Sequence, residues 1–500
     1  MTMNDVLDRL LDRLAYHPDE PLLFNSGLFL FLFLGFTFVY YFLRHQDKSR
    51  MVFVVLFSYY FYYKSSGWYL GLLAFVTVSD YCLAKLIRHE RAFHPRRPLK
   101  ARLLLMASIV TDLSLLGYFK YTNFLGGLIA PLFSSSFDPL DIFLPIGISF
   151  FIFQSMSYTI DVYRDRLYRL PSLLDYAFYV SFFPQLVAGP IVRACDFVPQ
   201  IHKPLRVTRE MFSRGVGFIL MGLFKKAVIS DYISLNFVDR IFDNPGLYTG
   251  VENLLGIYGY VLQLYCDFSG YSDIAIGLAL LLGFRFPLNF NAPYRADSIS
   301  DLWRRWHISL SSWVKDYVYI PLGGNRKGRW RGYANLFVTM VVCGLWHGAA
   351  LNFVVWGAVH GLACVVHRMG RQYIFRHPSH YHSQGVKRVF AIVFTVHFWA
   401  FSCIFFRNSS FESIGIQFRQ LFTAFHPEIF FGVIAGYGST FFLIVLGFVL
   451  HYLPSSWNQV YFKTLGKTPL PALALLFTLL VYVIIQVKGS GIQPFIYFQF

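Results

Sequence analysis

The sequence predicts an all-α, polytopic membrane protein, and three features of its composition and pattern support that fold class. Hydrophobic residues make up 56% of the 500 residues and aromatic residues 20%, whereas only 14% are charged. Soluble domains carry about 25% charged residues, so a water-exposed globule could not cover this much apolar surface. Apolar runs also recur along the whole chain with short breaks, which is the pattern of helices that use the bilayer as their solvent.

The apolar runs predict about eleven transmembrane helices, because a span needs about 20 mostly apolar residues. The candidate runs are 27–43, 51–63, 68–87, 103–119, 142–160, 174–188, 212–229, 254–284, 333–346, 351–366, 389–406, 430–450 and 472–487. Several are too short, or too often interrupted by Gly and Pro, for straight spans, so we expect re-entrant or interfacial helices among them. Residues 22–500 read as one membrane domain. Residues 1–21 are an extension, either an amphipathic helix on the membrane surface or a cytosolic segment.

The formal net charge of +17 would suggest a nucleic-acid partner in a soluble protein. Here the basic residues lie mostly in short loops between apolar runs, which is the bias that orients membrane proteins. We therefore expect membrane lipid and no nucleic acid as a partner. The loop 88–102 and the polar segment 285–332 are expected on the cytoplasmic side because both are rich in Lys and Arg.

Several common chemistries are absent from the sequence. The six cysteines form no CxxC pair, and most lie inside apolar runs, so neither a disulfide framework nor a metal site is expected. His89 and His94 are one residue too far apart for the HExxH zinc motif. The sequence also has no nucleophile elbow, phosphate-binding loop or dinucleotide fingerprint.

His347 is the first candidate catalytic residue, because it follows the apolar run 333–346 within Gly344-Leu345-Trp346-His347-Gly348. About fourteen helical steps of about 1.5 Å place it roughly 20 Å from the cytoplasmic start of that helix, deep in the membrane. Imidazole is suited to general-base chemistry near neutral pH. A packed, hydrogen-bonded histidine is the structural alternative.

His307 is the second candidate, in the sequence Trp303-Arg304-Arg305-Trp306-His307-Ile308-Ser309. Trp303, Trp306 and Trp313 fall at spacings that one helix allows, so we expect a partly buried amphipathic helix that dips into the protein. The alternative is a histidine on a cytoplasmic surface.

Asp267 and Asp273 lie inside the apolar run 254–284, where an unpaired charge is costly. They are six residues apart and do not share one helical face, which argues against a carboxyl pair that shares a proton. We expect a structural role, either capping a broken helix or pairing with a buried Arg.

Two functions from other classes compete with catalysis. Interrupted spans and the intramembrane carboxylates are compatible with a transporter of a small or proton-coupled solute, although the inverted repeats typical of transporters are absent. A non-catalytic assembly scaffold is the third possibility, and it would not need the two histidines.

Four segments together resemble the membrane-bound O-acyltransferase family, in its bacterial branch of alginate O-acetyltransferase membrane subunits. They are 183–191 (FPQLVAGPI), 265–277, 288–294 (LNFNAPY) and 301–325, which contains WRRWHISLSSW. The motif at 344–348 and the C-terminal PFIYFQF fit the same family. The resemblance covers most of the chain from Leu22 onward.

The resemblance implies helices around a central tunnel, with His347 and His307 as the two catalytic-site histidines and Asp267 and Tyr271 in structural or tunnel-lining positions. It further implies a multi-pass protein of the bacterial inner membrane that moves an acyl group, acetyl in the resembled proteins, to a polysaccharide hydroxyl. No bound cofactor is expected, and the co-substrate would be a thioester, acetyl coenzyme A or an acyl carrier protein. A partner acetyltransferase outside the cytoplasm would complete the transfer to the polymer.

Overall fold

A computed structural model describes residues 3–18, 20–93, 98–167, 169–187, 189–375, 382–487 and 495–496. Within those residues every regular element is helical and none is a strand, as predicted. The chain divides into two compact units. The first unit contains Met1–Gly215 and Ala275–Phe286, and the second contains Val216–Ile274 and Pro287–Phe500.

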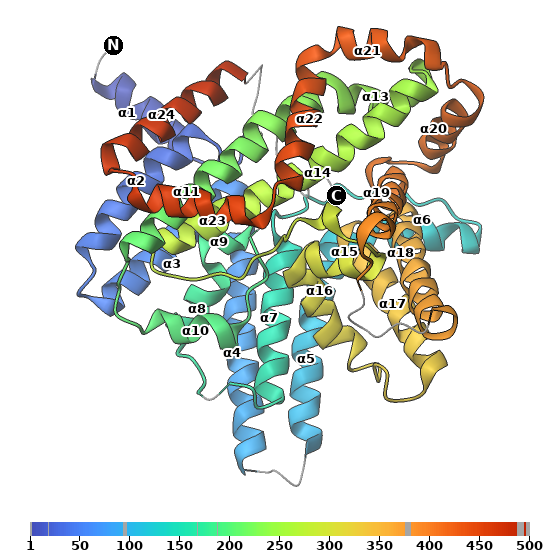
Figure 1. The fold of residues 1–500 in the computed structure, drawn as a ribbon. Helices are drawn as coiled ribbons and strands as arrows, with labels where there is room; N and C mark the ends of the chain where they lie inside the picture. Colours follow the sequence, from blue (N-terminus) through green and yellow to red (C-terminus); the bar gives the residue numbers. More distant parts are fainter. Residues whose placement is uncertain are drawn as a thin grey trace. The chain divides into compact units, whose positions relative to one another are not determined.

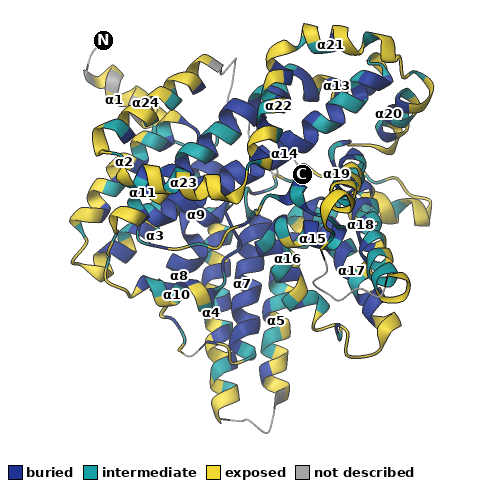
Figure 2. Cartoon of the chain, in the orientation of Figure 1, coloured by how far each residue is buried: buried dark blue, intermediate teal, exposed yellow. Residues whose placement is uncertain are grey.

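The first unit is built around three long helices that run side by side, α4, α5 and α7 (Figure 1). Its helices are α1 (Met3–Leu14), α2 (Gly27–Phe42), α3 (Asp47–Ser66), α4 (Leu70–Phe93), α5 (Pro98–Leu116), α6 (Thr122–Ile129), α7 (Ile148–Tyr163), α8 (Leu173–Ser181), α9 (Phe183–Leu186) and α10 (Ala194–Ile201). Helix α7 is buried along nearly its whole length, whereas α4 and α5 each keep an exposed side (Figure 2).

The loop predicted at 88–102 is shorter than expected, because α4 continues to Phe93 and α5 begins at Pro98. Residues 94–97 lie outside the described residues.

The second unit holds both candidate histidines. Two helices, α11 (Arg209–Leu223) and α14 (Gly250–Leu281), have residues in both units. The other helices of the second unit are α12 (Asp231–Ile233), α13 (Asp239–Asp243), α15 (Ile299–Arg305), α16 (Ile308–Val314), α17 (Arg329–His347), α18 (Leu351–Met369), α19 (Gly385–Arg407), α20 (Phe411–Thr423), α21 (Phe430–Gly436), α22 (Gly438–Tyr452), α23 (Ser455–Lys467) and α24 (Leu470–Val487).

Glycines allow α17 and α18 to pack closely against each other. A Cβ atom at Gly344 would lie 2.3 Å from the backbone oxygen of Phe353, and one at Gly357 would lie 2.6 Å from that of Met340. No side chain larger than hydrogen fits at either position, and small residues are what lets helices approach closely within a membrane. This contact fixes the end of α17, where His347 lies.

The structure does not confirm the predicted number of about eleven spans. Among the described residues, three helical stretches are long and apolar enough to cross a membrane: Asp47–Phe93, Leu351–Ile374 and Gly385–Arg407. A fourth crossing is possible if Pro427–Gly436 and Gly438–Tyr452, bent by 94°, act as one broken span. The shortfall has a physical cause, because the remaining apolar helices are short or interrupted. The run 27–43, for example, gives only the 16 residues of α2.

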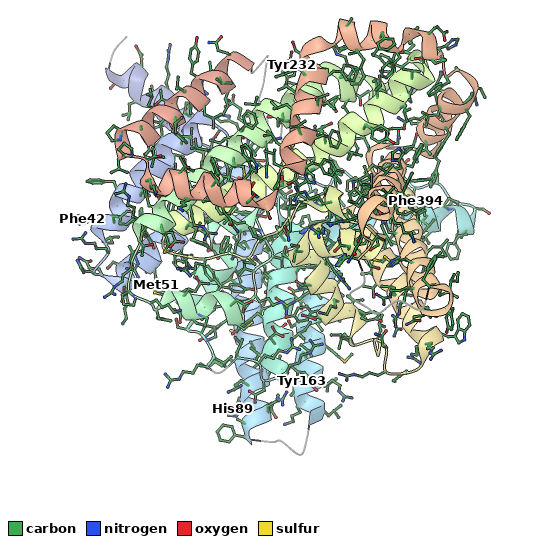
Figure 3. The ribbon with its side chains drawn as sticks, viewed as in Figure 1. Phe42, Met51, His89, Tyr163, Tyr232 and Phe394 are labelled. Atoms are coloured by element: carbon green, nitrogen blue, oxygen red, sulfur yellow. The ribbon has the colours of Figure 1, made fainter. Side chains whose placement is uncertain are left out.

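Exposed aromatic side chains show where the protein needs an apolar solvent. Phe42 at the end of α2 and Phe394 on α19 are 76% and 73% exposed, and both point away from the ribbon (Figure 3). Phe31 and Phe38 of α2 are exposed to a similar extent. A soluble monomer seldom exposes aromatic groups in such number, whereas lipid covers them at no cost.

Two local predictions need correction. The segment with Trp303, Trp306 and Trp313 is not one helix, because α15 ends at Arg305 and α16 begins at Ile308. It is partly buried, as predicted, since Trp306 and Trp313 are almost fully covered. The run 254–284, considered as a broken helix, is instead the continuous 32-residue helix α14.

The extension 1–21 contains helix α1 (Met3–Leu14). Leu7 and Leu11 lie one turn apart and are more than half exposed, with Asp8, Arg9 and Asp12 between or beside them. This amphipathic pattern agrees with a helix at a membrane surface, and that location stays a prediction.

Candidate active site

His347 is the last residue of α17, and only 2% of it is exposed. Helix α17 starts at Arg329, next to the basic segment, and its 19 residues place His347 about 27 Å from that end. Gly348 then leaves the helical conformation. The basic start and the apolar body agree with the predicted position of His347 deep within the membrane.

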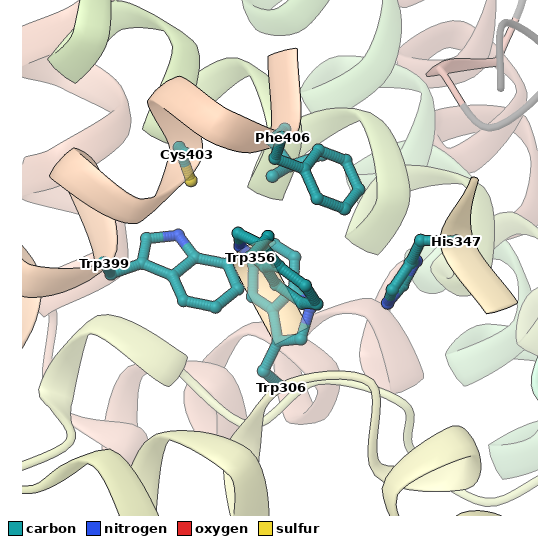
Figure 4. Close-up of a pocket in the computed structure, with 7 residues that line it drawn as sticks. Trp306, His347, Trp356, Trp399, Cys403 and Phe406 are labelled. Atoms are coloured by element: carbon teal, nitrogen blue, oxygen red, sulfur yellow. The ribbon is translucent and has the colours of Figure 1, made fainter. Parts of the chain in front are cut away.

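Aromatic rings surround the His347 imidazole on several sides. The ring centroid of His347 lies 5.2 Å from that of Trp356 and 5.3 Å from that of Phe406. The Cys343 sulfur lies 4.0 Å from His347 Nε2. A narrow void adjoins the imidazole (Figure 4) and is lined by Leu264, Trp306, His347, Trp356, Trp399, Cys403 and Phe406. The void is too tight to admit a water molecule, so a substrate can reach His347 only if some of these rings move.

His307 occupies the break between α15 and α16 and is completely buried. Its backbone has a φ of 42°, in the left-handed region that non-glycine residues seldom adopt, and such strain is often found at functional positions. The break turns the imidazole into the protein, where it packs against the Phe268 ring at 4.6 Å. His307 is therefore not the surface histidine that the sequence left open.

Asn289 determines which nitrogen of His307 carries the proton. The backbone N–H of Ser309 can only donate, and it lies 3.2 Å from Asn289 Oδ1, so that atom is the amide oxygen. His307 Nδ1 lies 3.1 Å from the same oxygen and must donate to it. The proton of the neutral ring is therefore on Nδ1, and Nε2 carries the lone pair. Burial lowers the pKa of His307, which lies outside the apolar spans, to about 3, so the ring is neutral at ordinary pH.

The rings of His307 and His347 both pack against the indole of Trp346. The Trp346 ring lies 5.0 Å from the His347 ring and 5.8 Å from the His307 ring. The sequence identified each histidine separately, and the fold places both against the residue that precedes His347.

The sequence did not identify several residues of this site. Trp356 and Trp399 line the void, and His360 packs 4.6 Å from Trp356 with its Nε2 3.0 Å from Ser402 Oγ. Helical spacing could have grouped Trp356 with His360, which lie four residues apart on α18. No local signal connects either with Trp399 on α19.

Asp267 and Asp273 have the structural role that the sequence predicts, although their partners are lysines rather than arginine. Lys226 Nζ lies 2.5 Å from Asp267 and 2.8 Å from Asp231, and Lys225 Nζ lies 2.7 Å from Asp273. Asp273 is thus paired with the charge of Lys225, whereas Asp267 and Asp231 share the single charge of Lys226. Such pairing is what makes the burial of a carboxylate tolerable.

The end of the chain contributes to the same region. The Ile496 N–H donates to Asp267 Oδ2 at 3.0 Å, and the buried Phe495 ring lies 4.8 Å from Tyr271 and 5.2 Å from Phe268. Phe268 is the residue that packs against His307. The rest of the C-terminal motif, Pro494 and 497–500, lies outside the described residues.

One group near the site has the composition of a metal ligand set. Single ligand atoms of Asp297, Asp301 and His382 lie within 4.8 Å of one another. Arg305 binds Asp301 at 2.7 Å, and His382 Nδ1 lies 3.0 Å from Asp297. These partners explain the cluster without a metal ion.

The exposed apolar helices and the two buried imidazoles beside an aromatic void define an integral membrane protein with a candidate histidine site. Residues 147–411 match the membrane-bound O-acyltransferase family. The chain is 43% identical over 351 residues to a probable alginate O-acetylase of Pseudomonas putida, covering 69% of this chain and 71% of that protein. It is 36% identical over 423 residues to a peptidoglycan O-acetyltransferase of Helicobacter pylori, covering 78% of each.

A teichoic acid D-alanyltransferase of Bacillus subtilis is 30% identical over 285 residues, covering 53% of this chain and 69% of that protein. The chain therefore belongs to the membrane-bound O-acyltransferase family. It is an O-acyltransferase and a multi-pass protein of the bacterial inner membrane, as the sequence predicts.

Proposed function

We propose that this protein moves an acetyl group from a cytosolic thioester toward a hydroxyl of an exported cell-surface polysaccharide. The single observation that carries the proposal is the pairing of two buried histidines on Trp346, in a chain that belongs to an O-acyltransferase family. The similar proteins are named for alginate, peptidoglycan and teichoic acid, which are all polymers of the cell surface. Two of the three names specify an acetyl group.

His347 acts in this mechanism as the general base. It takes the proton from the acceptor hydroxyl while the oxygen attacks the thioester carbonyl, and the proton then passes to the departing thiolate. An ester and a free thiol result. The buried, apolar surroundings favour this chemistry because they exclude water, which would otherwise hydrolyse the thioester.

His307 orients one of the substrates. Two roles are open to this second histidine of the family, orientation of the donor or stabilisation of the oxyanion. An oxyanion needs a hydrogen-bond donor, but Asn289 holds the proton of neutral His307 on Nδ1. Nε2 can therefore only accept, and the hydroxyl or amide N–H of a substrate is the matching group.

The void beside His347 is the central part of the substrate passage in this proposal. Trp306 and Trp356 both line it (Figure 4), so rotation of these indoles would widen it. The remaining apolar helices, including the two shorter ones Gly27–Phe42 and Leu470–Gln486, would complete about eleven crossings.

The donor is acetyl coenzyme A or an acyl carrier protein, and a partner acetyltransferase outside the cytoplasm receives the acetyl group before the polymer. Both are carried over from the family resemblance. Thiol release from either donor by the purified protein distinguishes them.

The test replaces His347 with Ala and measures O-acetyl groups on the cell-surface polymer by mass spectrometry. His397→Ala is the matched control, because His397 is also on an apolar helix but is exposed and bonds only a carbonyl of its own helix in the structure. We expect loss of acetylation in the first variant and normal acetylation in the second. Wild-type acetylation in a well-inserted His347→Ala protein would exclude the catalytic role. Unchanged polymer in a strain lacking the whole protein would exclude the proposed function.

The transporter alternative gains no support from the structure. The carboxylates that suggested it, Asp267 and Asp273, are both held in ion pairs with lysines.

A further inference from the structure

A second polar cluster lies inside the first unit, within the bundle of α4, α5, α7 and α8. Asp80 of α4 is completely buried and accepts hydrogen bonds from Ser108 of α5, at 2.8 Å, and from Ser155 of α7. Ser108 Oγ also lies 3.0 Å from Thr159 Oγ1, and Ser155 Oγ lies 2.5 Å from the Tyr176 hydroxyl of α8. Hydroxyl oxygens from α5, α7 and α8 thus gather around the Asp80 carboxylate of α4.

Asp112 of α5 brings a second carboxylate to the same place. It is also completely buried, and its carboxyl lies against that of Asp80. Among the described residues, no hydroxyl, amide or amine donates to either of its oxygens. The groups that act on Asp80 and Asp112 are hydroxyls and the other carboxyl, with no basic side chain among them. This differs from Asp267 and Asp273, which both have lysine partners.

Such a pair cannot remain as two bare negative charges. Two ionised carboxyls side by side in a low-dielectric interior repel each other and lack hydration, so something positive must accompany them. The cluster offers up to four carboxylate oxygens and several neutral hydroxyl oxygens, with no nitrogen or sulfur. Hard divalent cations select this composition, and Ca²⁺ takes six to eight such ligands.

We propose that Asp80 and Asp112, together with the hydroxyls of Ser108, Ser155 and Thr159, bind one Ca²⁺ ion. The double positive charge neutralises both carboxylates, and the ion occupies the unpaired oxygens of Asp112. The serine hydroxyls turn their hydrogens away on binding and present lone pairs. The site joins α4, α5 and α7, so the ion stabilises this bundle. This goes beyond the sequence, which gave no indication of a metal site.

The experiment uses the purified full-length protein in detergent, dialysed exhaustively against EDTA. Equilibrium binding of radioactive Ca²⁺ and the melting temperature are measured with and without added Ca²⁺, and with Mg²⁺ in parallel. We expect about one Ca²⁺ per chain and a rise in melting temperature on its addition, because a ligand that binds only the folded state stabilises it. Occupancy by Mg²⁺ in place of Ca²⁺ would overturn the choice of ion.

Three variants decide between an ion and a shared proton. Asp112→Asn imitates a protonated carboxyl, so it should abolish Ca²⁺ binding and the rise in melting temperature if the ion is present. Ser108→Ala keeps both carboxylates and should weaken Ca²⁺ binding about tenfold. This variant tests the site if Asp112→Asn does not fold. Asp161→Asn is the matched control, because Asp161 is a buried aspartate of α7 whose partner is Arg166 at 3.4 Å. It should bind Ca²⁺ like wild type.

The proposal is overturned if the wild-type protein binds no Ca²⁺ and its melting temperature does not respond. It is also overturned if Asp112→Asn binds as wild type does. The first result would mean that the two carboxyls share a proton, and the second that the ion binds elsewhere in the protein.

Discussion

The histidine site of the second unit and the carboxylate cluster of the first differ in how the free-energy cost of burying polar groups is compensated. Both bury polar groups in apolar surroundings, but His307 and His347 are surrounded mainly by aromatic rings, whereas Asp80 and Asp112 are surrounded by hydroxyls. A neutral imidazole loses little on burial and needs one partner to fix its tautomer. A carboxylate needs a counter-charge. The histidine site therefore keeps imidazole lone pairs that can accept a proton or a hydrogen bond. The carboxylate cluster carries negative charge that a positive partner must neutralise.

The largest effect is expected at the histidine that serves as the base. His347→Ala should lower the rate of acetyl transfer about 10²–10⁴-fold, because a positioned general base contributes roughly that much. The melting temperature should also fall, because removal of the buried imidazole enlarges the void, so rates are compared per folded molecule. Initial rates of thiol release by purified variant and wild type are the measurement. Rates within twofold of each other would contradict the assignment.

Asn289 tests the histidine side of this comparison, because its side-chain oxygen fixes the tautomer of the buried His307. Asn289→Leu should lower the rate about 10–100-fold through loss of the tautomer. Asn289→Asp keeps the acceptor for Nδ1–H but adds a negative charge beside the ring, which raises the pKa of His307 from about 3. Below the raised pKa the ring carries a second proton and Nε2 can no longer accept.

The acidic limb of the pH–rate profile of Asn289→Asp should therefore move to higher pH. Profiles of the wild type and both variants are the measurement. A structural role alone would lower the rates of both variants equally at every pH, and that outcome would contradict the positioning role.

The histidine site depends on close helix packing, and Gly357 tests this. A Cβ there would lie 2.6 Å from the Met340 backbone oxygen, so Gly357→Val must push α17 and α18 apart. We expect a loss of about 3 kcal/mol of stability and reduced transfer, because α17 carries His347. Thermal unfolding and transfer rates are measured together. Gly436→Val is the control, since a Cβ at Gly436 meets nothing within 4 Å.

The smallest effect is expected in the carboxylate cluster. Ser155→Ala removes one donor to Asp80 and the hydroxyl partner of Tyr176, which should cost about 1–2 kcal/mol. Transfer per folded molecule should stay at the wild-type rate, because the residue belongs to the first unit and touches none of the histidine-site residues described above. Loss of transfer without loss of stability would show that the two regions are coupled.

Particular residues show which features of the fold and site could be predicted from the sequence. Low charge and long apolar runs predicted the helical membrane class, and the basic start of the run 333–346 placed His347 correctly at the far end of its helix. Periodicity suggested one helix through the three tryptophans and missed the break at His307. Backbone hydrogen bonds join the chain on both sides of that break to Asn289 and Asn291, which lie outside the segment. The predicted number of spans stays unconfirmed, because several apolar runs form helices too short to meet the length of a full span.

The sequence by itself determined the class of protein, because the choice between water and lipid depends on composition averaged over each run. The tertiary structure alone decided which of these groups meet: His307 with Asn289, His307 with Trp346, and Asp80 with Asp112. Those contacts join residues on different elements, and they depend on how the side chains of neighbouring helices fit together. No pattern within a single run records that fit.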